Sequence, residues 1–186
     1  MGRYEFKPGN MLYPVPAVLV SCVDKAGQQN LFTVAWTGTI CSNPPMVSIS
    51  VRKERHSYNM IKETGEFVIN LTTKELAFAT DYCGVKSGRD VDKWAKTGLT
   101  PVESTKVKAS SVKESPVSIE CKVDEIKELG THDMFIATVV AVTVDDKYMD
   151  ETGKFHYMDS NPIAYSHGEY YTLGERLGKF GYSVKK

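Results

Sequence analysis

A short stretch of this sequence, residues 30–57, combines aromatic, hydroxyl-bearing and basic side chains with a rigid turn. The segment Thr33-Val34-Ala35-Trp36 is followed by a hydroxyl-rich run and by the turn Ser42-Asn43-Pro44-Pro45. The two prolines fix the backbone and remove two amide donors, and the hydroxyl groups before them can hydrogen-bond to the edge of a flat polar heterocycle. The same residues also fit an ordinary rigid turn between two strands, with its hydroxyl groups satisfied inside the protein.

The run Arg52-Lys53-Glu54-Arg55-His56-Ser57 has the residue types of a phosphate site. We predict a short helix that is capped by Ser57 and ended by Gly65. Guanidinium groups and free backbone N–H groups would then meet at the helix N-terminus, where a phosphate binds well. A second short helix near Asp90 supplies Lys93. The alternative is that Ser57 is merely an N-cap and that the cations form a solvated surface.

Three further side chains have ordinary structural interpretations as well. Trp36 could belong to the core, as large aromatic residues in strands usually do. His132 follows Gly130-Thr131 and is predicted to lie in a hairpin turn, where a histidine is commonly solvated. Tyr165 could be an ordinary aromatic residue of a strand. The residues alone leave these alternatives open.

Other kinds of chemistry find no support in the sequence. It has no G-x-S-x-G nucleophile motif, no Walker-type glycine loop, and no G-x-G-x-x-G that opens a helix after a strand. The four cysteines, at positions 22, 41, 83 and 121, form no C-x-x-C pair, and the four histidines are scattered. We therefore expect buried or half-buried free thiols, no metal site, and no side chain that acts as a nucleophile, acid or base.

The elements that must position these residues are predicted to be mainly antiparallel strands. Residues 18–23 and 31–36 flank the turn Asp24-Lys25-Ala26-Gly27 as a hairpin. Alternating apolar and polar residues, or continuous apolar runs, predict at least four more strands. These strands lie near 47–52, 66–71, 117–123 and 134–144. The last of them is almost continuously apolar, which is typical of a strand inside a sheet.

Three short helices punctuate these strands. After the first, an apolar stripe over 76–83 closes at Gly84, and a turn or two covers 90–94 before Gly98. Because long helices do not separate the strands regularly, a closed antiparallel barrel with helical insertions is favoured over a parallel doubly wound sheet. The segment 106–116, rich in Lys and Ser, has no apolar period and is predicted to be a surface loop.

Length and composition limit the classes of protein further. With 186 residues, 41% of them hydrophobic, the chain is expected to form a single domain, residues 1–186. Its 23 basic and 23 acidic residues balance, which argues against a nucleic-acid or anionic-membrane partner. The longest apolar run, 134–144, is about half the length of a membrane-spanning helix. Prolines interrupt residues 1–16, which lack the apolar core of a signal peptide, so we expect a cytoplasmic protein.

Taken together, these motifs resemble the flavin reductase-like family. The resemblance rests on the [ST]-x-A-W segment at 33–36, the S-N-P-P turn at 42–45, the basic strand end before 56–57, the Ser-Gly-x-Asp-x-x-Lys segment at 87–93, and Thr131-His132. In spacing the chain is closest to flavoredoxin and related small flavin reductases. The resemblance implies a mainly β fold: an antiparallel Greek-key FMN-binding split β-barrel with short helical insertions. It also implies a homodimer, with the flavin near the subunit interface.

The resemblance carries residue roles with it. It places Trp36 beside the flavin ring, Asn30 in a polar contact, and Lys93 on the FMN phosphate. It also places His132 and Tyr165 at the cofactor site. The whole set of FMN-contacting residues that it implies is Asn30, Thr33, Val34, Ala35, Trp36, Thr37, Cys41, Ser42, Asn43, Arg52, His56, Ser57, Ser87, Arg89, Lys93, His132 and Tyr165.

The function that the resemblance implies is that of an FMN-binding oxidoreductase, either an NAD(P)H-dependent flavin reductase or a flavoredoxin-like electron-transfer protein. A hydride would pass from nicotinamide to flavin N5 and the electrons then to an acceptor, while the protein orients the rings and excludes water. Because the chain has no Rossmann motif, NAD(P)H would bind transiently against the flavin, and a protein electron donor is the other partner expected. A non-catalytic FMN-binding or storage module is the competing hypothesis.

Overall fold

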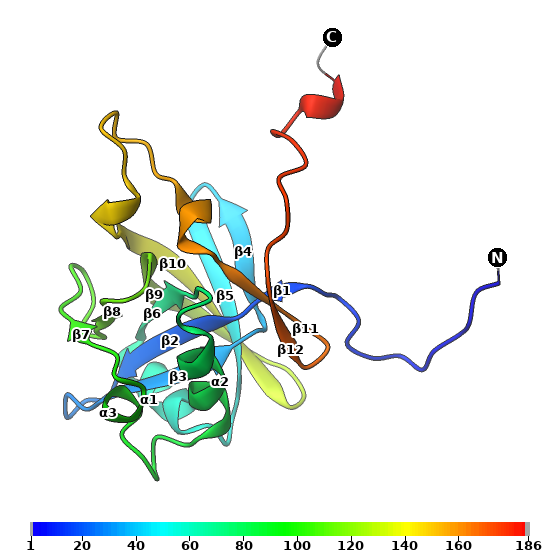
Figure 1. Cartoon of the computed structure of the whole chain (residues 1–186). Helices are drawn as coiled ribbons and strands as arrows, with labels where there is room; N and C mark the ends of the chain where they lie inside the picture. Colours follow the sequence, from blue (N-terminus) through cyan, green and yellow to red (C-terminus); the bar gives the residue numbers. More distant parts are fainter. Residues whose placement is uncertain (1, 185–186) are drawn as a thin grey trace.

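The computed structural model describes residues 2–184 of the chain, in which seven strands form one antiparallel sheet (Figure 1). In the order in which they pair, these strands are β3 (Gln29–Val34), β2 (Val18–Val23), β6 (Glu66–Leu71), β9 (Val117–Glu128), β10 (His132–Val144), β5 (Pro45–Arg52) and β4 (Thr37–Ser42). The prediction of a mainly antiparallel β fold is therefore confirmed. The apolar strand β10 lies inside the sheet, between β9 and β5, as its sequence indicated.

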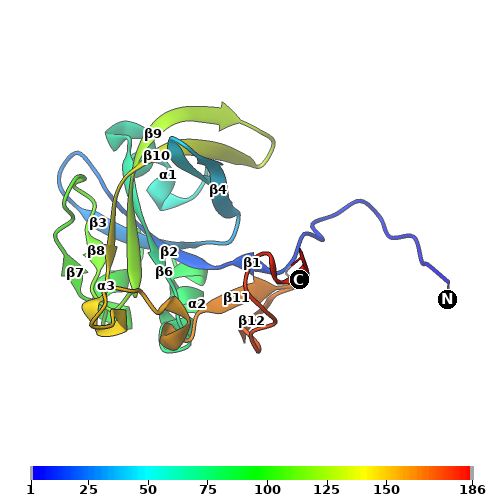
Figure 2. The same ribbon diagram turned by 90° about the horizontal axis from the view of Figure 1, so that it is seen from above.

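The two outermost strands of this sheet, β3 and β4, follow each other directly in the chain, separated by Ala35 and Trp36. A flat sheet of seven strands would hold its edges about 29 Å apart, at about 4.8 Å per strand. Three residue steps reach at most about 11 Å, so the sheet has to curl until its edges meet. We call the junction at Ala35 and Trp36 the seam. The Ser50 N–H group of β5 donates to the Trp36 carbonyl oxygen at 2.8 Å, which extends the β4–β5 pairing into this junction. Figure 2 shows the strands arranged around a common interior.

Smaller elements lie around the barrel. A second sheet contains β1 (Val15–Pro16), β11 (Ile163–Ser166) and β12 (Glu169–Thr172), and β7 (Pro101–Val102) pairs with β8 (Ser111–Val112). The helices are α1 (His56–Thr64), α2 (Ala77–Val85) and α3 (Lys93–Thr97), with short 3₁₀ turns η1 (Asp146–Tyr148), η2 (Tyr157–Ser160) and η3 (Tyr182–Val184). The two ends of the chain leave the barrel as extended segments (Figure 1).

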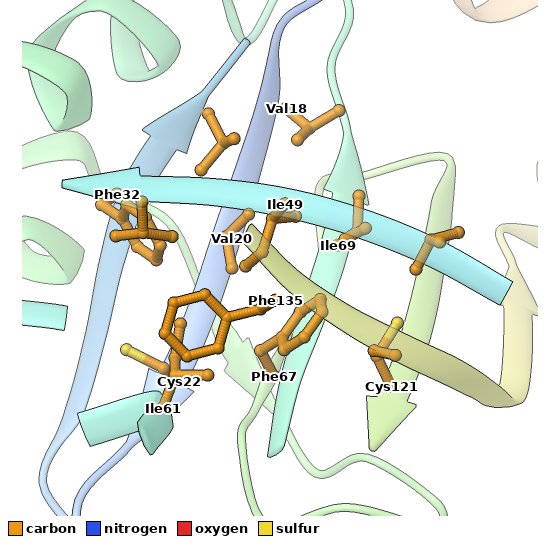
Figure 3. Close-up of a cluster of buried hydrophobic side chains, with 14 of the residues drawn as sticks. Val18, Val20, Cys22, Phe32, Ile49, Ile61, Phe67, Ile69, Cys121 and Phe135 are labelled. Atoms are coloured by element: carbon orange, nitrogen blue, oxygen red, sulfur yellow. The ribbon is translucent and has the colours of Figure 1, made fainter. Parts of the chain in front are cut away.

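The interior of the barrel is filled by one cluster of apolar side chains (Figure 3). On β5 the inward residues Val47, Ile49 and Val51 are buried and alternate with more exposed neighbours, as the period of a strand requires. Strand β2 is buried on both faces. Its outward residue Leu19 packs in a second apolar cluster. That cluster also contains Leu76, which directly precedes α2, and side chains of α2 and α3, so these helices cover the outer face of the sheet there.

The predicted helix boundaries are only partly correct. Gly65 and Gly98 end α1 and α3 with φ angles of 70° and 68°, which glycine adopts readily. Ser57 is not the N-cap of α1: the helix begins one residue earlier, at His56, and Arg55 is its N-cap without a capping side chain. The physical reason is that the Ser57 hydroxyl is already used, since it accepts a hydrogen bond from Asn30 Nδ2 at 2.7 Å.

The other two helices also differ from the prediction at their ends. Gly84 does not end α2, which continues to Val85, and the missing side chain at Gly84 lets the helix approach Thr33 of β3. The third helix begins at Lys93 rather than near 90, because the Asp92 carboxylate accepts a hydrogen bond from the Ala95 N–H group and caps it there.

The segment 106–116 is not a simple surface loop, contrary to the prediction. It lies over the sheet, with Val107 and Ala109 buried in a third apolar cluster, and it includes β8. Irregular backbone can be buried only if its polar groups find partners. Here the buried Glu120 carboxylate of β9 accepts hydrogen bonds from the N–H groups of Thr105 at 2.8 Å and Lys106 at 2.6 Å. A test based on periodicity does not detect such a segment.

All four cysteines are free, as expected: three are buried and Cys41 is half-buried. Among residues 2–184, no helix is long and apolar enough to cross a membrane.

Asn70, a fully buried residue of β6, connects the segment 106–116 to the sheet. Its Oδ1 atom accepts hydrogen bonds from the Val112 N–H group at 2.9 Å and from Ser118 Oγ at 2.8 Å. Its Nδ2 group donates to the Leu19 carbonyl oxygen and to Ser21 Oγ, both at 3.2 Å. One amide side chain therefore satisfies polar groups from three elements, β2, β8 and β9, that meet outside the barrel.

Replacing Asn70 with alanine should lower the free energy of unfolding by about 2 to 4 kcal/mol, because buried donors and acceptors lose their partners. Urea unfolding followed by tryptophan fluorescence measures the change. The exposed Asn59 on α1 is the matched control, and Asn59→Ala should stay within about 0.5 kcal/mol of the wild type. Equal effects of the two substitutions would show that the hydrogen bonds of Asn70 do not stabilise the fold.

Candidate functional site

Two adjoining cavities open at the seam of the barrel. The larger, of about 880 Å³, is bounded by 9–12, 32–37 and 50–52, together with Arg55 and the pair Thr131-His132. The smaller, of about 260 Å³, lies beside the start of α1 and the segment 83–93. Both are lined by Phe32, Thr33, Arg52 and Arg55, so they form one continuous site.

The floor of the larger cavity is built by the strands that meet at the seam. Trp36 is half-buried there, and its ring centroid lies 6.1 Å from that of Tyr13. Two hydroxyl groups on this floor are already bonded within the protein, since Thr33 Oγ1 donates to the Thr80 carbonyl oxygen and Thr37 Oγ1 donates to that of Ser48. The hydroxyl protons of Thr33 and Thr37 are therefore not available to a ligand.

The smaller cavity is centred on the N-terminus of α1. No side chain caps this helix, so the N–H groups of His56 and Ser57 remain available to an anion, whereas that of Tyr58 donates to the Arg55 carbonyl oxygen at 3.0 Å. Asn30 and Ser57 are held together beside it by their 2.7 Å hydrogen bond. Gly88 closes over Asn30 so tightly that a Cβ atom would lie 2.3 Å from Asn30 Oδ1. This close approach makes glycine necessary at position 88.

Lys93 is the most unusual charged residue of the smaller cavity. It is only 4% exposed, and its Nζ group donates to the Cys83 carbonyl oxygen at 2.8 Å. Burial lowers the pKa of the Lys93 ammonium from its ordinary 10.5 to about 8, and the nearby Arg55 contributes to the shift. The ammonium group is therefore held in place without a carboxylate, in a position where an anion would stabilise its charge.

The two histidines of the site are held in the neutral form. Burial lowers the pKa of His56, with a contribution from Arg89 and Lys93. Burial also lowers the pKa of His132, and the nearby Arg52 acts in the same direction. At neutral pH these rings can therefore offer hydrogen bonds but little positive charge.

The structure brings together thirteen of the seventeen residues predicted for the site. Those lining one or both cavities are Asn30, Thr33, Val34, Ala35, Trp36, Thr37, Arg52, His56, Ser57, Ser87, Arg89, Lys93 and His132. His132 is the first residue of β10 rather than part of the preceding turn.

Four of the predicted residues line neither cavity. Cys41, Ser42 and Asn43 lie at the far end of the β4–β5 hairpin, about six residues or roughly 20 Å along the strand from Trp36. They are close to the site in sequence, but the hairpin carries them away from it. Tyr165 lies on β11, where its ring is 6.0 Å from that of Tyr13. A role for these four in cofactor binding stays a prediction.

Some lining residues were not predicted. The segment 9–12 has no periodic pattern that would mark it as part of a site, and Phe32 was indistinguishable from a core residue. Arg55 lies in the basic run that suggested a phosphate site, so the signal for it was present. The structure contains no cluster of three or more metal-binding side chains among residues 2–184.

The lowered pKa of Lys93 makes the stability of the protein depend on pH. Between pH 8 and 10.5 the unfolded chain keeps the proton that the folded protein has lost, so Lys93 alone should add up to about 3 kcal/mol to the free energy of unfolding as the pH rises. The raised pKa values of the buried Cys22, Cys83 and Cys121 act in the opposite direction above pH 9, so the contribution of Lys93 is the difference between the pH profiles of the wild type and Lys93→Met. In Lys93→Met this increment should disappear, whereas the exposed Lys96→Met on the same helix should keep it. Urea unfolding at several pH values measures it, and identical pH profiles for wild type and Lys93→Met would refute the assignment.

Comparisons with known proteins agree with this fold. The chain is 33% identical over 146 residues to an uncharacterized protein of Archaeoglobus fulgidus. This match covers 78% of this chain and 81% of that protein. Among solved structures, flavoredoxin of Desulfovibrio vulgaris (Miyazaki F) superposes with a TM-score of 0.91 at 33% identity, covering 99% of this chain and 100% of that one.

A putative flavin reductase with a split barrel domain from Shewanella frigidimarina superposes with a TM-score of 0.81 at 27% identity, over 91% of this chain and 86% of that one. The predicted split barrel is thereby confirmed. The family model described as "Flavin reductase like domain" matches residues 10–174. With nearly the whole barrel inside that match, the chain belongs to the flavin reductase-like family.

Proposed function

We propose that this protein is an FMN-binding oxidoreductase, either an NAD(P)H-dependent flavin reductase or a flavoredoxin-like electron-transfer protein. The observation that carries the proposal is the continuity of the two cavities. A wide cavity walled by Trp36 leads directly into a small cationic one at an uncapped helix N-terminus. This matches the shape and charge of a flat ring system attached to a phosphate.

The residues present fit FMN in detail. The larger cavity would hold the isoalloxazine ring along 32–37, against the side chain of Trp36. The smaller would hold the phosphate, which could accept hydrogen bonds from the Ser57 hydroxyl, the N-terminus of α1 and Lys93. The close approach of Gly88 to Asn30 keeps this cavity narrow.

Bound FMN would supply the redox chemistry, accepting a hydride from a reduced nicotinamide and passing electrons to an acceptor. The chain itself would bind and orient the rings and exclude water from one face of the flavin. His56 and His132 would remain neutral and serve as hydrogen-bonding groups rather than as proton donors. A nicotinamide donor would bind transiently over the larger cavity, and a protein electron donor is the alternative partner.

Three further features belong to the proposal. A single domain over residues 1–186 is supported by the one large sheet and by the extent of the family match. A homodimer is supported by the extended ends of the chain, where Leu12, Leu177 and Phe180 are 86%, 89% and 108% exposed and would gain from burial on a second copy. A reducing compartment such as the cytoplasm is supported by the four free thiols.

The test of the proposed function is anaerobic. The purified protein, or the apoprotein after FMN is added, should show a visible spectrum altered from that of free FMN. Mixing with NADH or NADPH should then bleach the flavin faster than it bleaches free FMN under the same conditions. A protein that leaves FMN fluorescence and anisotropy unchanged would disprove the cofactor. Bleaching at the rate of free FMN would exclude the NAD(P)H-dependent reductase and leave the electron-transfer protein with a protein donor and the non-catalytic FMN-binding module.

The role of Lys93 is tested by comparing FMN with riboflavin, which lacks the phosphate. If the ammonium binds the phosphate, Lys93→Ala should weaken FMN binding by roughly 10- to 150-fold, the value of one charge-assisted hydrogen bond. Riboflavin affinity should hardly change. Because the pKa of Lys93 is about 8 in the free protein, the FMN affinity of the wild type should also fall above that pH, and that of the variant should not.

Lys96→Ala, on the exposed face of the same helix, is the control and should affect neither ligand. Equal losses for FMN and riboflavin in Lys93→Ala would show that Lys93 shapes the cavity without binding the phosphate. Titration of flavin fluorescence with each protein measures both affinities.

A further inference from the structure

The two cavities carry more positive charge than one FMN phosphate needs. The side chains that carry a full charge at neutral pH and line them are Arg52, Arg55, Lys86, Arg89, Lys93 and a single carboxylate, Glu54. The chain as a whole has a formal charge of zero, so this excess of four is local. A bound phosphate monoester brings about two negative charges. About two positive charges then remain without a counterion at the site.

These cations are not equivalent in position. Lys86, Arg89 and Lys93 line only the smaller cavity. Lys93 is fixed there by the Cys83 carbonyl oxygen, and Arg89 Nη1 donates to the Glu54 carbonyl oxygen at 3.2 Å. These groups therefore serve the end of the site where a phosphate meets the helix N-terminus.

Arg52 and Arg55 instead lie where the two cavities join. Arg52 is paired with Glu54 at 3.1 Å, but both side chains are about half exposed or more, so this ion pair is weak. Among residues 2–184, no carboxylate lies within ion-pair distance of Arg55. Arg55 is thus an exposed, unpaired guanidinium at the edge of the larger cavity, on the side toward the proposed phosphate.

The larger cavity has more space than the flavin ring system alone would fill. Its volume of about 880 Å³ is near the top of the range of roughly 300–1,000 Å³ found for pockets that hold a whole ligand. A tricyclic ring alone, with its ribityl chain directed to the smaller cavity, fills part of it. The remaining space lies beside the same arginines and beside His132, which pairs with Arg52 in the register of β10 and β5.

We propose that Arg55, assisted by Arg52, binds a phosphate group of the second reactant, and that this reactant is a reduced nicotinamide nucleotide. The inference rests on the proposed function and extends it to the electron donor. Guanidinium groups bind phosphates through paired hydrogen bonds, and an unpaired arginine at a cavity edge also attracts anions from solution. A phosphate held at the junction would leave the nicotinamide ring free to reach over the larger cavity.

The reaction that reports this binding is balanced by the two molecules alone. Bound FMN would accept one hydride, which would leave C4 of the dihydronicotinamide with both electrons of its bond and form the N5–H bond of the flavin. The donor would become the oxidised pyridinium form, and the flavin would gain the two electrons and one proton of the hydride. No other oxidant or reductant is needed.

The experiment compares donors that differ in their phosphates. Wild type and Arg55→Gln, both loaded with FMN, are mixed anaerobically with NADH, NADPH, reduced nicotinamide mononucleotide, and the neutral 1-benzyl-1,4-dihydronicotinamide. For the nucleotides, the second-order rate of flavin bleaching in Arg55→Gln should fall by roughly 10- to 100-fold relative to the rate with the neutral donor. A loss confined to NADPH would assign the interaction to its 2′-phosphate, and a loss shared by the three nucleotides to the phosphate next to the nicotinamide riboside.

Binding without turnover gives an independent readout. The affinity of NAD⁺ and NADP⁺ for the FMN-loaded protein, followed by flavin fluorescence, should fall in Arg55→Gln and recover in part in Arg55→Lys, which keeps the charge but loses the paired hydrogen bonds. Raising the salt concentration should weaken nucleotide binding more in the wild type than in Arg55→Gln. Lys25→Gln, in the exposed β2–β3 turn away from both cavities, is the matched control and should behave as the wild type.

Two results would overturn this inference and leave the proposed function intact. If Arg55→Gln weakens FMN but not riboflavin, as expected for Lys93→Ala, then Arg55 belongs to the FMN phosphate. If all donors lose rate equally, the neutral one included, Arg55 does not recognise the phosphate of the donor. Failure of the proposed function appears instead in the wild type, which would bind no FMN or be reduced by no donor.

Discussion

The two-residue connection between the outermost strands of the sheet is the constraint on which the rest of the structure depends. Because Ala35 and Trp36 must join β3 to β4, the sheet cannot stay open, and the end of β3 is brought to β5, whose Ser50 N–H group donates to the Trp36 carbonyl oxygen. Strand β5 leads directly into α1, so the start of that helix is brought to the same place. The fold thus brings an aromatic surface and a helix N-terminus together, and the hydrogen bond from Asn30 of β3 to Ser57 of α1 holds them there.

The charge at the site follows from this arrangement. A helix that begins against the barrel, with Arg55 as an N-cap that offers no capping oxygen, leaves polar N–H groups and a positive dipole end at the cavity. Adding the buried ammonium of Lys93 beside them is unfavourable in the free protein, and its lowered pKa reflects that penalty. In the proposed function a dianionic ligand would remove the penalty when it binds. Part of the protein's stability would thereby be given up for affinity, which is common at binding sites.

Local patterns in the sequence predicted which strands and helices form better than they predicted the residues at which these elements begin and end. The hairpin of β2 and β3 and the bounds of β6 followed from β-branched runs and turn residues, and Gly65 stops α1 as expected. The start of α1 was misplaced because Ser57 bonds to Asn30, a partner 27 residues away that no local pattern reveals. Proximity in sequence also misled: residues 41–43 adjoin Trp36 in the chain but lie at the other end of a hairpin. Long-range pairing, rather than residue type, decided these cases.

The two sides of the larger cavity are built in different ways, and this difference bears on specificity. Its floor consists of strand residues that are fixed by ladder hydrogen bonds and by the barrel core, so its shape is set by the fold. Its rim comes from the extended segment 9–12 and from the ends of β5 and β10, where Arg52, Arg55 and His132 contribute little to the core. Substitutions at the rim therefore affect stability less than substitutions in the floor. In the proposed function the flavin ring would lie on this floor and the second reactant at the rim, so substitutions at the rim would change the recognition of the second reactant while the barrel stays unchanged.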